Sequence, residues 1–385
     1  MRQETQIDLV GRILDMHAQR TTSLAPDVWP VPAGDYVSSS RFDLEQATVF
    51  RDPVFACLSG DIPESGDHFS LESGGVPIVV VRGTDHRVRA YLNACRHRAS
   101  PLVQEPGHVA RSFSCPFHGW VYEIDDGRLT GRPRSCDGFA SVDDASLGLR
   151  PLPAAEVRGL VVVSPAGGPF DVEQWLCGLG PELASYRMGS VLPYRRASQR
   201  WACNWKLLLD TFFESYHVFA LHRASLGALY LGIASPFDAF GPHNRLVVPQ
   251  TSILELTDQP REKWDLMSHA VVQYFLAPNL ILSNLYGYVV TWRFVPLGAG
   301  ETLVENALYT EGPVLTDAER AHYDSRFAAG RAITGEEDYP ASEAIHRNLS
   351  SGCVDHTLIG RNEPGVVHFH QTLAARLQGR DHGDG

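Results

Sequence analysis

The sequence predicts an α+β protein with two domains: a small antiparallel β domain, followed by a larger mixed domain with an antiparallel sheet. Three observations predict this class. The chain has 385 residues, more than a single small module usually holds. Short β-rich runs, separated by glycine and aspartate turns, fill residues 44–165. Helical and strand-like segments then follow one another over residues 166–385.

Composition and charge exclude several classes of protein. The chain is 44% hydrophobic and 20% charged, which is typical of a globular protein. Its net charge of -12 repels phosphate backbones and anionic lipids, so we expect no nucleic-acid and no membrane partner. We find neither a long apolar run nor a signal peptide, and therefore expect a cytoplasmic protein. Seven scattered cysteines, an odd number, indicate reduced thiols.

The first part of the chain, residues 1–43, is predicted to be a helix and a connector that pack on the larger domain. Apolar side chains recur with nearly helical spacing in the first 20 residues, and the proline-bearing stretch SLAPDVWPVPAGDY follows. In the β domain, the predicted strands lie in the runs VPIVVVRG, RVRAYLNA, SFSCPFHGWVYEI and GLVVVSP.

The larger domain is predicted to be helical at residues 172–189 and to contain a long, strongly apolar helix in NWKLLLDTFFESYHVFALH, residues 204–222. Residues 316–349 are predicted to be helical again. Successive strands are predicted between them, in the runs QTSILEL, AVVQYFLAPNLILSNL, GYVVTWRFVPL and TLVENALYTE.

Two cysteine–histidine pairs lie close together in the β domain. Cys95 and His97 are one residue apart, Cys115 and His118 are two residues apart, and 17 residues separate the pairs. A zinc site is one interpretation, although zinc fingers usually pair Cys with Cys and His with His. Mixed pairs suit a [2Fe-2S] cluster in which one iron takes both thiolates and the other takes both imidazoles. The spacing C-x-H-x17-C-x2-H, with Pro116 after the second cysteine, resembles the Rieske motif.

One position departs from many Rieske sequences, because Ala99 stands where a glycine is usual after the RHR stretch. The remaining five cysteines are predicted to be inert core residues rather than ligands.

A second group of polar residues lies in the long predicted helix. Asp210, Glu214 and His217 are spaced by four and three positions and would share one face. His222 follows five residues after His217, about 140° around a regular helix, so both could bind one metal only if the helix distorts or ends between them. Two histidines and a carboxylate on one face of an iron leave positions open for O2 and substrate. Two ordinary helix histidines are the alternative.

The segment NWKLLLDTFFESYHVFALH, placed after a Rieske motif, resembles the catalytic segment of Rieske non-heme iron oxygenases, the ring-hydroxylating oxygenase α-subunit family. The resemblance extends over nearly the whole chain. It implies an N-terminal Rieske domain and a helix-grip (START-like) catalytic domain. It also implies a [2Fe-2S] cluster, a mononuclear non-heme Fe(II) held by His217 and His222, and O2 as co-substrate.

The resemblance further implies an acidic third iron ligand. Family members carry an acidic pair in the region where this chain has Glu336, Glu337 and Asp338 at the start of a predicted helix. We predict that Asp338 is the ligand and that Glu337 is its nearest rival. An acidic helix start, favoured by the helix dipole, is the alternative without a metal.

The family also places an acidic residue three positions before the first iron ligand, where it bridges the iron of one subunit and the cluster of its neighbour. This position is Glu214. Most aromatic-ring dioxygenases have Asp there, and Glu occurs in some relatives that act on quaternary amines. Asp210 either supports an iron ligand through a hydrogen bond or is an ordinary helix residue.

An inter-subunit bridge implies a ring-shaped homotrimer, to which a separate β subunit could be added. The chain has no dinucleotide fingerprint and no second cysteine cluster of ferredoxin spacing. Electrons from NAD(P)H are therefore expected to arrive indirectly, through a separate flavin reductase, a ferredoxin or both.

Apolar side chains near the predicted iron favour a hydrophobic substrate, aromatic or polycyclic, that is hydroxylated or dihydroxylated, as in aromatic hydrocarbon catabolism. The alternative within the family is an oxidative N- or O-demethylase or a quaternary-amine monooxygenase, which Glu214 favours. Alternatives of another class are a Rieske electron carrier without oxygenase activity and a zinc-stabilised binding module. The candidate pocket residues are Phe212, Phe213, Phe219, Leu221, Phe275, Leu282 and Tyr286.

Overall fold

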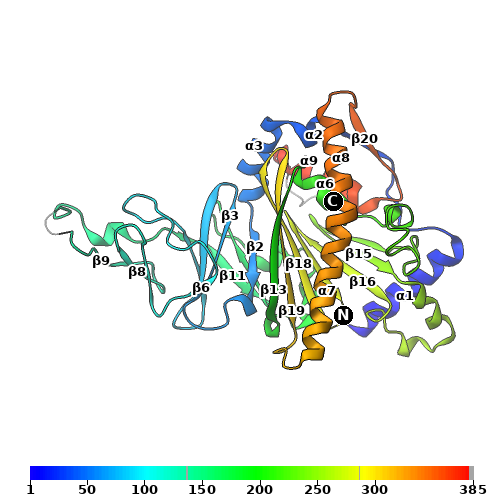
Figure 1. Ribbon diagram of the computed structural model, residues 1–385, viewed down its shortest axis with the longest axis horizontal. Coiled ribbons are helices and arrows are strands. Elements are labelled where there is room, and N and C mark those ends of the chain that lie inside the picture. Colours follow the sequence, from blue (N-terminus) through cyan, green and yellow to red (C-terminus); the bar gives the residue numbers. More distant parts are fainter. Residues whose placement is uncertain (136–137, 286, 381–385) are drawn as a thin grey trace. The chain divides into compact units, whose positions relative to one another are not determined.

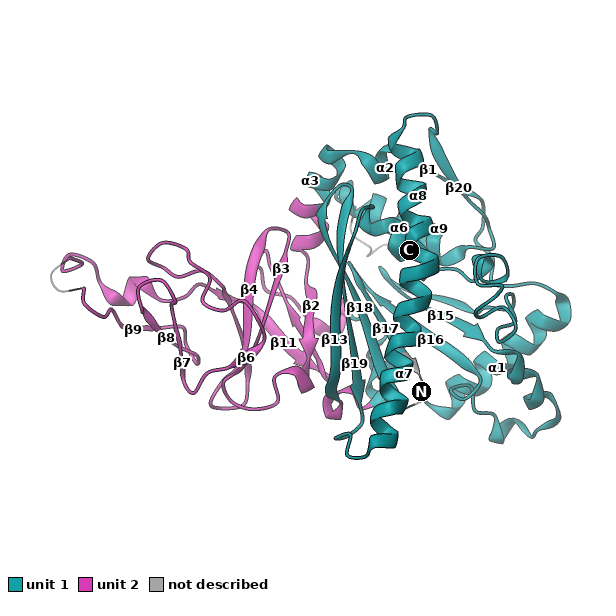
Figure 2. Cartoon of the chain, in the orientation of Figure 1, with its two compact units in different colours: residues 1–45, 176–186, 192–385 teal, residues 46–175, 187–191 magenta. Residues whose placement is uncertain are grey.

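The computed structural model describes residues 1–135, 138–285 and 287–380, without the side chains of residues 284 and 285. The chain divides into two compact units, which Figure 2 shows in different colours. The smaller unit comprises residues 46–175 and 187–191, and the larger unit comprises residues 1–45, 176–186 and 192–385. The α+β class is confirmed, whereas the exact domain bounds that we expected from the sequence stay predictions.

The smaller unit consists of three antiparallel sheets, with strand orders β10-β5-β4-β3-β6, β11-β12-β2 and β7-β8-β9 (Figure 1). The predicted small antiparallel β domain is thereby confirmed. Its strands are β2 (Val54–Leu58), β3 (Asp67–Ser73), β4 (Val76–Arg82), β5 (Val88–Leu92), β6 (Gly107–His108), β7 (Ser112–Ser114), β8 (Val121–Glu123), β9 (Leu129–Gly131), β10 (Pro151–Leu152), β11 (Ala154–Val157) and β12 (Leu160–Val163). Its short helices are η1 (Val49–Arg51), η2 (Ser59–Asp61), η3 (Asp144–Leu147), α4 (Val172–Trp175) and η5 (Met188–Ser190).

Strand β4 explains why this unit has two cores. Its side chains alternate between the two faces of the sheet, with Ile78 and Val80 in one apolar cluster and Val79 and Val81 in the other. A strand that is buried on both faces appears in sequence as a continuous apolar run, as VPIVVVRG does. The second cluster contains Cys95, Cys115, Trp120 and Tyr122, so the predicted metal loops rest on a packed core.

The larger unit is built on a seven-stranded antiparallel sheet of order β13-β19-β18-β17-β16-β15-β14. Its strands are β13 (Leu192–Trp201), β14 (Phe237–Phe240), β15 (His243–Pro249), β16 (Ala270–Leu276), β17 (Leu280–Leu285), β18 (Tyr288–Gly298) and β19 (Glu301–Thr310), and β1 (Trp29–Pro32) pairs separately with β20 (His356–Ile359). Its helices are α1 (Gln3–Gln19), α2 (Gly34–Val37), α3 (Ser39–Ala47), α5 (Gly180–Leu183), η4 (Ala184–Tyr186), α6 (Trp205–Asp210), η6 (Tyr216–Phe219), η7 (Thr251–Asp258), η8 (Arg261–Lys263), α7 (Asp317–Ile333), η9 (Thr334–Asp338), α8 (Tyr339–Ser350) and α9 (Pro364–Leu377).

Helix α7 packs on β18, where the ring of Tyr323 contacts the ring of Tyr288 with centroids 6.0 Å apart (Figure 1). At the end of α7 the chain makes a single π-helical turn, η9, and continues as α8. The predicted helical region 316–349 is thus confirmed, with an interruption that the sequence did not reveal. Single π turns inside helices occur frequently at functional sites.

A buried ion pair joins the N-terminal segment to α6. The Lys206 ammonium is fully buried and lies 2.7 and 2.9 Å from the two carboxylate oxygens of Glu45. The Trp205 indole N–H donates to the same carboxylate at 2.9 Å. Burial lowers the pKa of Lys206, and the Glu45 carboxylate opposes that effect. The beginning of α6 is therefore held in place by a charge pair that would be costly to break.

The long helix predicted over residues 204–222 is wrong. Helix α6 ends at Asp210, and the chain continues through turns into the 3-10 helix η6. Two contacts explain the ending. First, the Glu214 carboxylate accepts hydrogen bonds from the backbone N–H groups of Tyr216 and His217. Second, the backbone of α9 comes very close to Phe213, since a Cβ added to Gly365 would lie 2.4 Å from the carbonyl oxygen of Phe213.

Two further predictions fail for a related reason. The run QTSILEL forms the 3-10 helix η7 rather than a strand, and residues 172–189 form short pieces rather than one helix. Short apolar runs do not distinguish strand from helix, so tertiary packing decides between them. The helix at the N-terminus and the strands β16, β17, β18 and β19 are confirmed. Among the described residues, no helix combines the length and apolar character needed to span a membrane.

Candidate metal centres

Two loops of the smaller unit carry the four predicted cluster residues. The first loop follows β5 and holds Cys95 and His97, and the second joins β7 to β8 and holds Cys115 and His118. Both loops close in the same way, because the backbone N–H of each cysteine donates to a carbonyl five residues further on, at 2.8 Å. Each loop therefore presents one thiol and one imidazole from the same kind of turn.

The structure brings the four side chains together. The Nδ1 atoms of His97 and His118 lie 3.1 Å apart, and Trp120 stacks on the His97 ring with centroids 4.9 Å apart. The thiols of Cys95 and Cys115 are buried, whereas His118 is exposed. Two buried sulfurs and two imidazoles that face each other fit the donor set of a Rieske [2Fe-2S] cluster.

Hydrogen bonds act on both sulfur atoms. The Cys95 Sγ lies 3.2 Å from the Tyr122 hydroxyl, while burial raises the pKa of the Cys95 thiol. At Cys115 burial acts in the same direction, but hydrogen bonds from the backbone N–H groups of Phe117 and His118 bring the pKa below its ordinary value. Donors directed at a sulfur stabilise the thiolate and tune the potential of a bound cluster.

Ala99, which replaces the usual glycine, adopts a left-handed backbone conformation with φ of +57°. In this region the Cβ of an L-residue crowds the backbone, at a cost of about 1–2 kcal/mol. The N–H of Ala99 donates to the carbonyl of Cys95 at 2.8 Å, so the tight turn of the first loop holds the strained conformation. The departure from the motif lies at a position whose geometry suits glycine.

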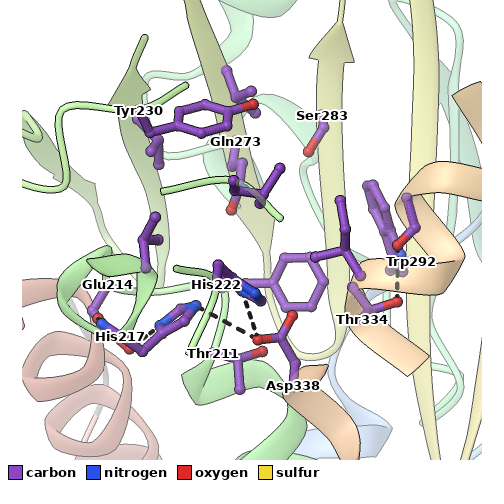
Figure 3. A pocket seen from close by; sticks show the side chains of 17 residues that line it. Thr211, Glu214, His217, His222, Tyr230, Gln273, Ser283, Trp292, Thr334 and Asp338 are labelled. Carbon is purple, nitrogen blue, oxygen red and sulfur yellow. Dashed lines mark hydrogen bonds and ion pairs between the residues drawn. The ribbon is translucent and has the colours of Figure 1, made fainter. Parts of the chain in front are cut away.

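A second convergence of metal-ligating groups lies in the larger unit, where His217, His222 and Asp338 each offer one atom within 4.8 Å of the others (Figure 3). His217 lies in η6, His222 follows it, and Asp338 ends the π turn η9. The Asp338 Oδ1 lies 3.0 Å from the His222 Nε2 and 3.6 Å from the His217 Nε2. A regular helix would point the two histidines in different directions, but α6 ends before them, so both imidazoles can face Asp338.

Carboxylates also lie behind both imidazoles. The Glu214 carboxylate contacts the Nδ1 of His217, and the Glu337 Oε2 lies 3.0 Å from the Nδ1 of His222. Ser225 donates to the same Glu337 oxygen at 3.0 Å. Each ring is therefore oriented by a hydrogen bond at Nδ1, which leaves Nε2 directed at Asp338.

The electrostatics of His222 follow from this enclosure. The side chain is buried, and burial lowers its pKa, but the carboxylates of Asp338 and Glu337 together raise the pKa above its ordinary value. The hydrogen bond from His222 in turn lowers the pKa of Glu337. The site is thus a strongly negative environment for two imidazoles and favours a bound cation.

The donor set fits a mononuclear iron. The Asp338 Oδ1 is buried and has no hydrogen-bond partner, which is costly for a carboxylate unless a cation satisfies it. Two imidazoles and one carboxylate on one side of the ion match the facial triad of non-heme Fe(II) oxygenases. Between the two predicted candidates, Asp338 faces both Nε2 atoms, whereas Glu337 lies on the far side of the His222 ring.

The described side-chain contacts of Asp210 are with Tyr36 and His370 rather than with a predicted iron ligand. Its carboxylate accepts a hydrogen bond from the Tyr36 hydroxyl at 2.9 Å and lies 3.0 Å from the Nε2 of His370. The Tyr36 hydroxyl also lies 3.0 Å from that nitrogen, and burial raises the pKa of Tyr36. These contacts connect α6 with α2 and α9.

A cavity of about 150 Å³ adjoins the triad (Figure 3). The chain segments around α6, the strands β15 to β18 and the end of α7 form its wall. Its lining residues are Thr211, Phe212, Glu214, His217, Val218, His222, Leu226, Tyr230, Val248, Val271, Gln273, Ser283, Trp292, Gly330, Ile333, Thr334 and Asp338.

Of the predicted pocket residues, Phe212 lines this cavity. Phe213 and Phe275 instead pack against each other in the core, with centroids 4.9 Å apart, and Leu282 is buried outside the wall. Phe219 and Leu221 are exposed at the surface. Tyr286 lies outside the described residues, as does Cys136.

Sequence reasoning missed the polar wall of the cavity. Gln273 and Ser283 lie opposite each other on β16 and β17, and the Gln273 Oε1 and Ser283 Oγ are buried without hydrogen-bond partners. Gln273 interrupts the apolar run AVVQYF, and Ser283, followed by Asn284, interrupts the apolar run LILSNL. That pattern was the available signal, because a buried polar side chain needs a partner or a ligand.

Comparisons with known proteins agree with both centres. A model of the Rieske [2Fe-2S] domain matches residues 52–142, and a model of the ring hydroxylating alpha subunit (catalytic domain) matches residues 188–379. The carnitine monooxygenase oxygenase subunit of Escherichia coli (strain K12) is 25% identical over 366 residues, which cover 90% of this chain and 94% of that protein. The glycine betaine monooxygenase oxygenase subunit of Pseudomonas aeruginosa (strain UCBPP-PA14) is 32% identical over 201 residues, 52% of this chain and 46% of that protein.

Solved structures share the fold. The quaternary ammonium Rieske monooxygenase CntA, in complex with L-carnitine, superposes with a TM-score of 0.75 at 21% identity, over 92% of this chain and 96% of that chain. The naphthalene 1,2-dioxygenase from Rhodococcus sp. superposes with a TM-score of 0.74 at 20% identity, over 97% of this chain and 98% of that chain. One fold thus serves enzymes named for very different substrates.

The chain belongs to the Rieske non-heme iron oxygenases, in the ring-hydroxylating α-subunit family. It is an oxidoreductase and the terminal oxygenase component of such a system. The cofactors of this family are a Rieske [2Fe-2S] cluster and a mononuclear iron, and its members take electrons from a reductase or ferredoxin to act on small molecules.

The variant Ala99→Gly is expected to be more stable than the parent chain by about 1 kcal/mol, because glycine adopts the left-handed conformation without crowding. A higher midpoint of thermal unfolding in the cluster-containing protein would show this. A midpoint equal to or below that of the parent would mean that Ala99 is not strained.

The variant Asp338→Asn is expected to lose the mononuclear iron and to keep the cluster, because a neutral amide replaces the anionic ligand. The measurement is iron per chain together with the visible spectrum of the cluster. Glu336→Gln is the matched control, because Glu336 is an exposed acid of the same π turn and should keep full iron content. Full iron in Asp338→Asn would contradict the assignment.

Proposed function

We propose that this chain is a terminal monooxygenase that oxidises a small quaternary-amine substrate at a carbon bonded to the nitrogen. From the sequence, apolar side chains favoured an aromatic or polycyclic substrate, and a quaternary-amine monooxygenase was the alternative within the family. We now adopt that alternative. The observation that carries it is the cavity beside His217, His222 and Asp338, which is small and has both aromatic and polar walls.

The size of the cavity limits the substrate. A volume of about 150 Å³ equals that of an engineered protein cavity that accommodates benzene. A trimethylammonium head group is of similar size, whereas a polycyclic hydrocarbon is considerably larger.

The chemistry of the wall also favours a cation. The aromatic side chains of Phe212, Tyr230 and Trp292 line the cavity, and aromatic faces attract quaternary ammonium groups. The Gln273 Oε1 and the Ser283 Oγ are buried without hydrogen-bond partners among the described residues, so a hydrocarbon in this cavity would leave them unsatisfied. The carnitine and glycine betaine monooxygenase subunits among the relatives support the same substrate class.

The reaction balances as a monooxygenation. One oxygen atom of O2 converts a substrate C–H bond to C–OH, and the other leaves as water, with two electrons and two protons from the reductase system. A carbinol on a carbon bonded to the quaternary nitrogen then breaks its C–N bond, releasing an aldehyde, a tertiary amine and a proton. When bound, the mononuclear iron supplies the activation of O2, and the cluster supplies its electrons.

The residues of the chain position these events. Glu214 and Glu337 orient the two imidazoles, and the apolar wall, which includes Val218 and Leu226, limits the entry of water. The aromatic faces hold the ammonium group so that a neighbouring carbon lies toward the triad.

The proposal includes a homotrimer in which Glu214 connects the cluster of one subunit to the iron of its neighbour. Tyr216, Phe219 and Leu221 follow Glu214 in sequence and are exposed at 55%, 60% and 39%. Phe117, beside the cluster residue His118, is exposed at 54%. Exposed apolar side chains next to both centres support the burial of these surfaces against another subunit.

Turnover of a substrate panel under 18O2 tests the reaction. With a suitable reductase and NADH, we expect an aldehyde and a tertiary amine from a quaternary amine such as carnitine or glycine betaine, with one labelled oxygen in the aldehyde when its exchange with water is suppressed by immediate reduction. Naphthalene is the comparison substrate. A labelled dihydrodiol from naphthalene, with no product from any quaternary amine, would overturn the proposal.

The variant Glu214→Gln tests the bridge. We expect the variant to retain the cluster and the mononuclear iron, but reoxidation of the reduced cluster should become about 10–100-fold slower. The reason is that a neutral amide is a weaker hydrogen-bond acceptor than a carboxylate, both for the His217 imidazole and for a group of the neighbouring subunit. Stopped-flow absorbance with substrate and O2 measures this rate. An unchanged rate would exclude the bridging role, and Glu336→Gln serves as the control.

A further inference from the structure

A second, smaller hollow lies next to the cavity at the iron site, between α7 and the strands β18 and β19. Its volume is about 30 Å³, and Trp292 and Gly330 line both hollows. Its lining residues are Tyr288, Val290, Trp292, Asn306, Arg326, Phe327, Gly330 and Arg331. A space of this volume has room for one or two groups of the size of a water molecule, such as a carboxylate.

Two buried donors in this hollow have no hydrogen-bond partner within the described part of the chain. Trp292 and Asn306 lie opposite each other on β18 and β19 and are exposed at only 7% and 8%. Between described residues, neither the Trp292 Nε1 nor the Asn306 Nδ2 makes a hydrogen bond. A buried donor without an acceptor is destabilising, so a ligand that offers acceptor atoms fits beside this pair.

Two guanidinium groups from α7 line the same hollow. Arg331 donates to Gln199 at 3.3 Å through one of its nitrogens, which leaves further donors on the group. Burial raises the pKa of the hydroxyl of Tyr230, which lines the larger cavity, and the nearby charge of Arg326 partly opposes that effect. The described residues that line this hollow include no Asp or Glu. Donors and positively charged groups therefore make up half of its described lining, beside Tyr288, Val290, Phe327 and Gly330.

An anion is the natural occupant of such a site. A carboxylate offers two oxygens with about four acceptor positions, and guanidinium groups bind it with planar, paired hydrogen bonds. The larger cavity has the opposite character near the triad, where Glu214 and Asp338 are carboxylates. The two adjoining hollows are therefore complementary to the two ends of a zwitterion.

We infer that the hollow lined by Trp292, Asn306, Arg326 and Arg331 binds the carboxylate of a zwitterionic substrate whose quaternary ammonium group lies in the cavity beside the triad. This inference rests on the proposed function and adds a requirement to it, namely that the substrate carries an acid. Recognition of the acid would orient the molecule with its ammonium end toward the metal site.

The test compares two ligands that differ at one end. Glycine betaine has a carboxylate where choline has a hydroxymethyl group, and both carry the same trimethylammonium group. Calorimetric titration of the holoenzyme without O2 measures the Kd of each ligand in the parent chain and in the variants Arg326→Gln and Arg331→Gln. Arg320→Gln is the matched control, because Arg320 is an exposed arginine of the same helix, paired with Asp317 at 2.5 Å, and lies outside the hollow.

The parent chain is expected to bind glycine betaine more tightly than choline. In each of the two variants, the ratio of the Kd of glycine betaine to that of choline should rise by about 10–100-fold, the effect of losing a hydrogen bond between charged groups. In Arg320→Gln the ratio should stay within about twofold of the parent, as is usual for exposed pairs. This pattern would support the carboxylate subsite.

Two other outcomes overturn the inference and are distinguishable. If the ratio stays unchanged in Arg326→Gln and Arg331→Gln while both ligands bind the parent chain, the carboxylate subsite is wrong and the quaternary-amine function stands. If the parent chain binds neither ligand and oxidises no quaternary amine, the proposed function fails, and the subsite fails with it.

Discussion

The burial of a single carboxylate, that of Asp338, is the constraint on which the catalytic part of this molecule depends. A buried charge is costly unless hydrogen bonds or a cation compensate it. Here the Nε2 atoms of His217 and His222 lie 3.6 and 3.0 Å from the Asp338 Oδ1, which has no hydrogen-bond partner among the described residues, so a bound cation would compensate the charge. The backbone is shaped to meet this demand, since α6 ends at Asp210 and a π turn precedes α8.

Charges are arranged in layers around this carboxylate. Glu214 and Glu337 lie behind the histidines at their Nδ1 atoms, so three carboxylates enclose two imidazoles. A ferrous ion would balance much of this negative charge, and its affinity for such a site is part of the stability of the holoenzyme. Beyond the triad lie aromatic faces, and beyond these lie the arginines of α7. The polarity of the enclosed space therefore runs from acidic at the metal to basic at α7.

Much of the fold could be predicted because local patterns and tertiary structure agree. The antiparallel β domain, the first helix and the strands β16 to β19 all follow from periodicity and turn residues. The failure at residues 211–222 has a physical cause. Asp210, Glu214 and His217 have the spacing of one helix face, so the pattern of the sequence continues past Asp210, where α6 ends.

The pocket could not be predicted from apolar character, since the same criterion selects core and pocket residues alike. The apolar side chains of Phe213 and Phe275 pack with Phe369 in the core and do not line the cavity. The residues that distinguish this cavity from a core are the polar ones on β16 and β17, Gln273 and Ser283. Asn306 has the same significance in the smaller hollow, and Trp292 lines both spaces.

The sequence by itself determined the two kinds of metal chemistry, because the ligand types and their spacing within each short segment are local properties of the chain. It also determined the architecture of an antiparallel β domain followed by a mixed one. Only the tertiary structure decided which acid faces both histidines, because Glu337 and Asp338 lie more than 100 residues further along the chain. The acid that faces both of them is Asp338. Only the tertiary structure decided the size and polarity of the cavity, because these depend on which side chains from distant strands and helices meet.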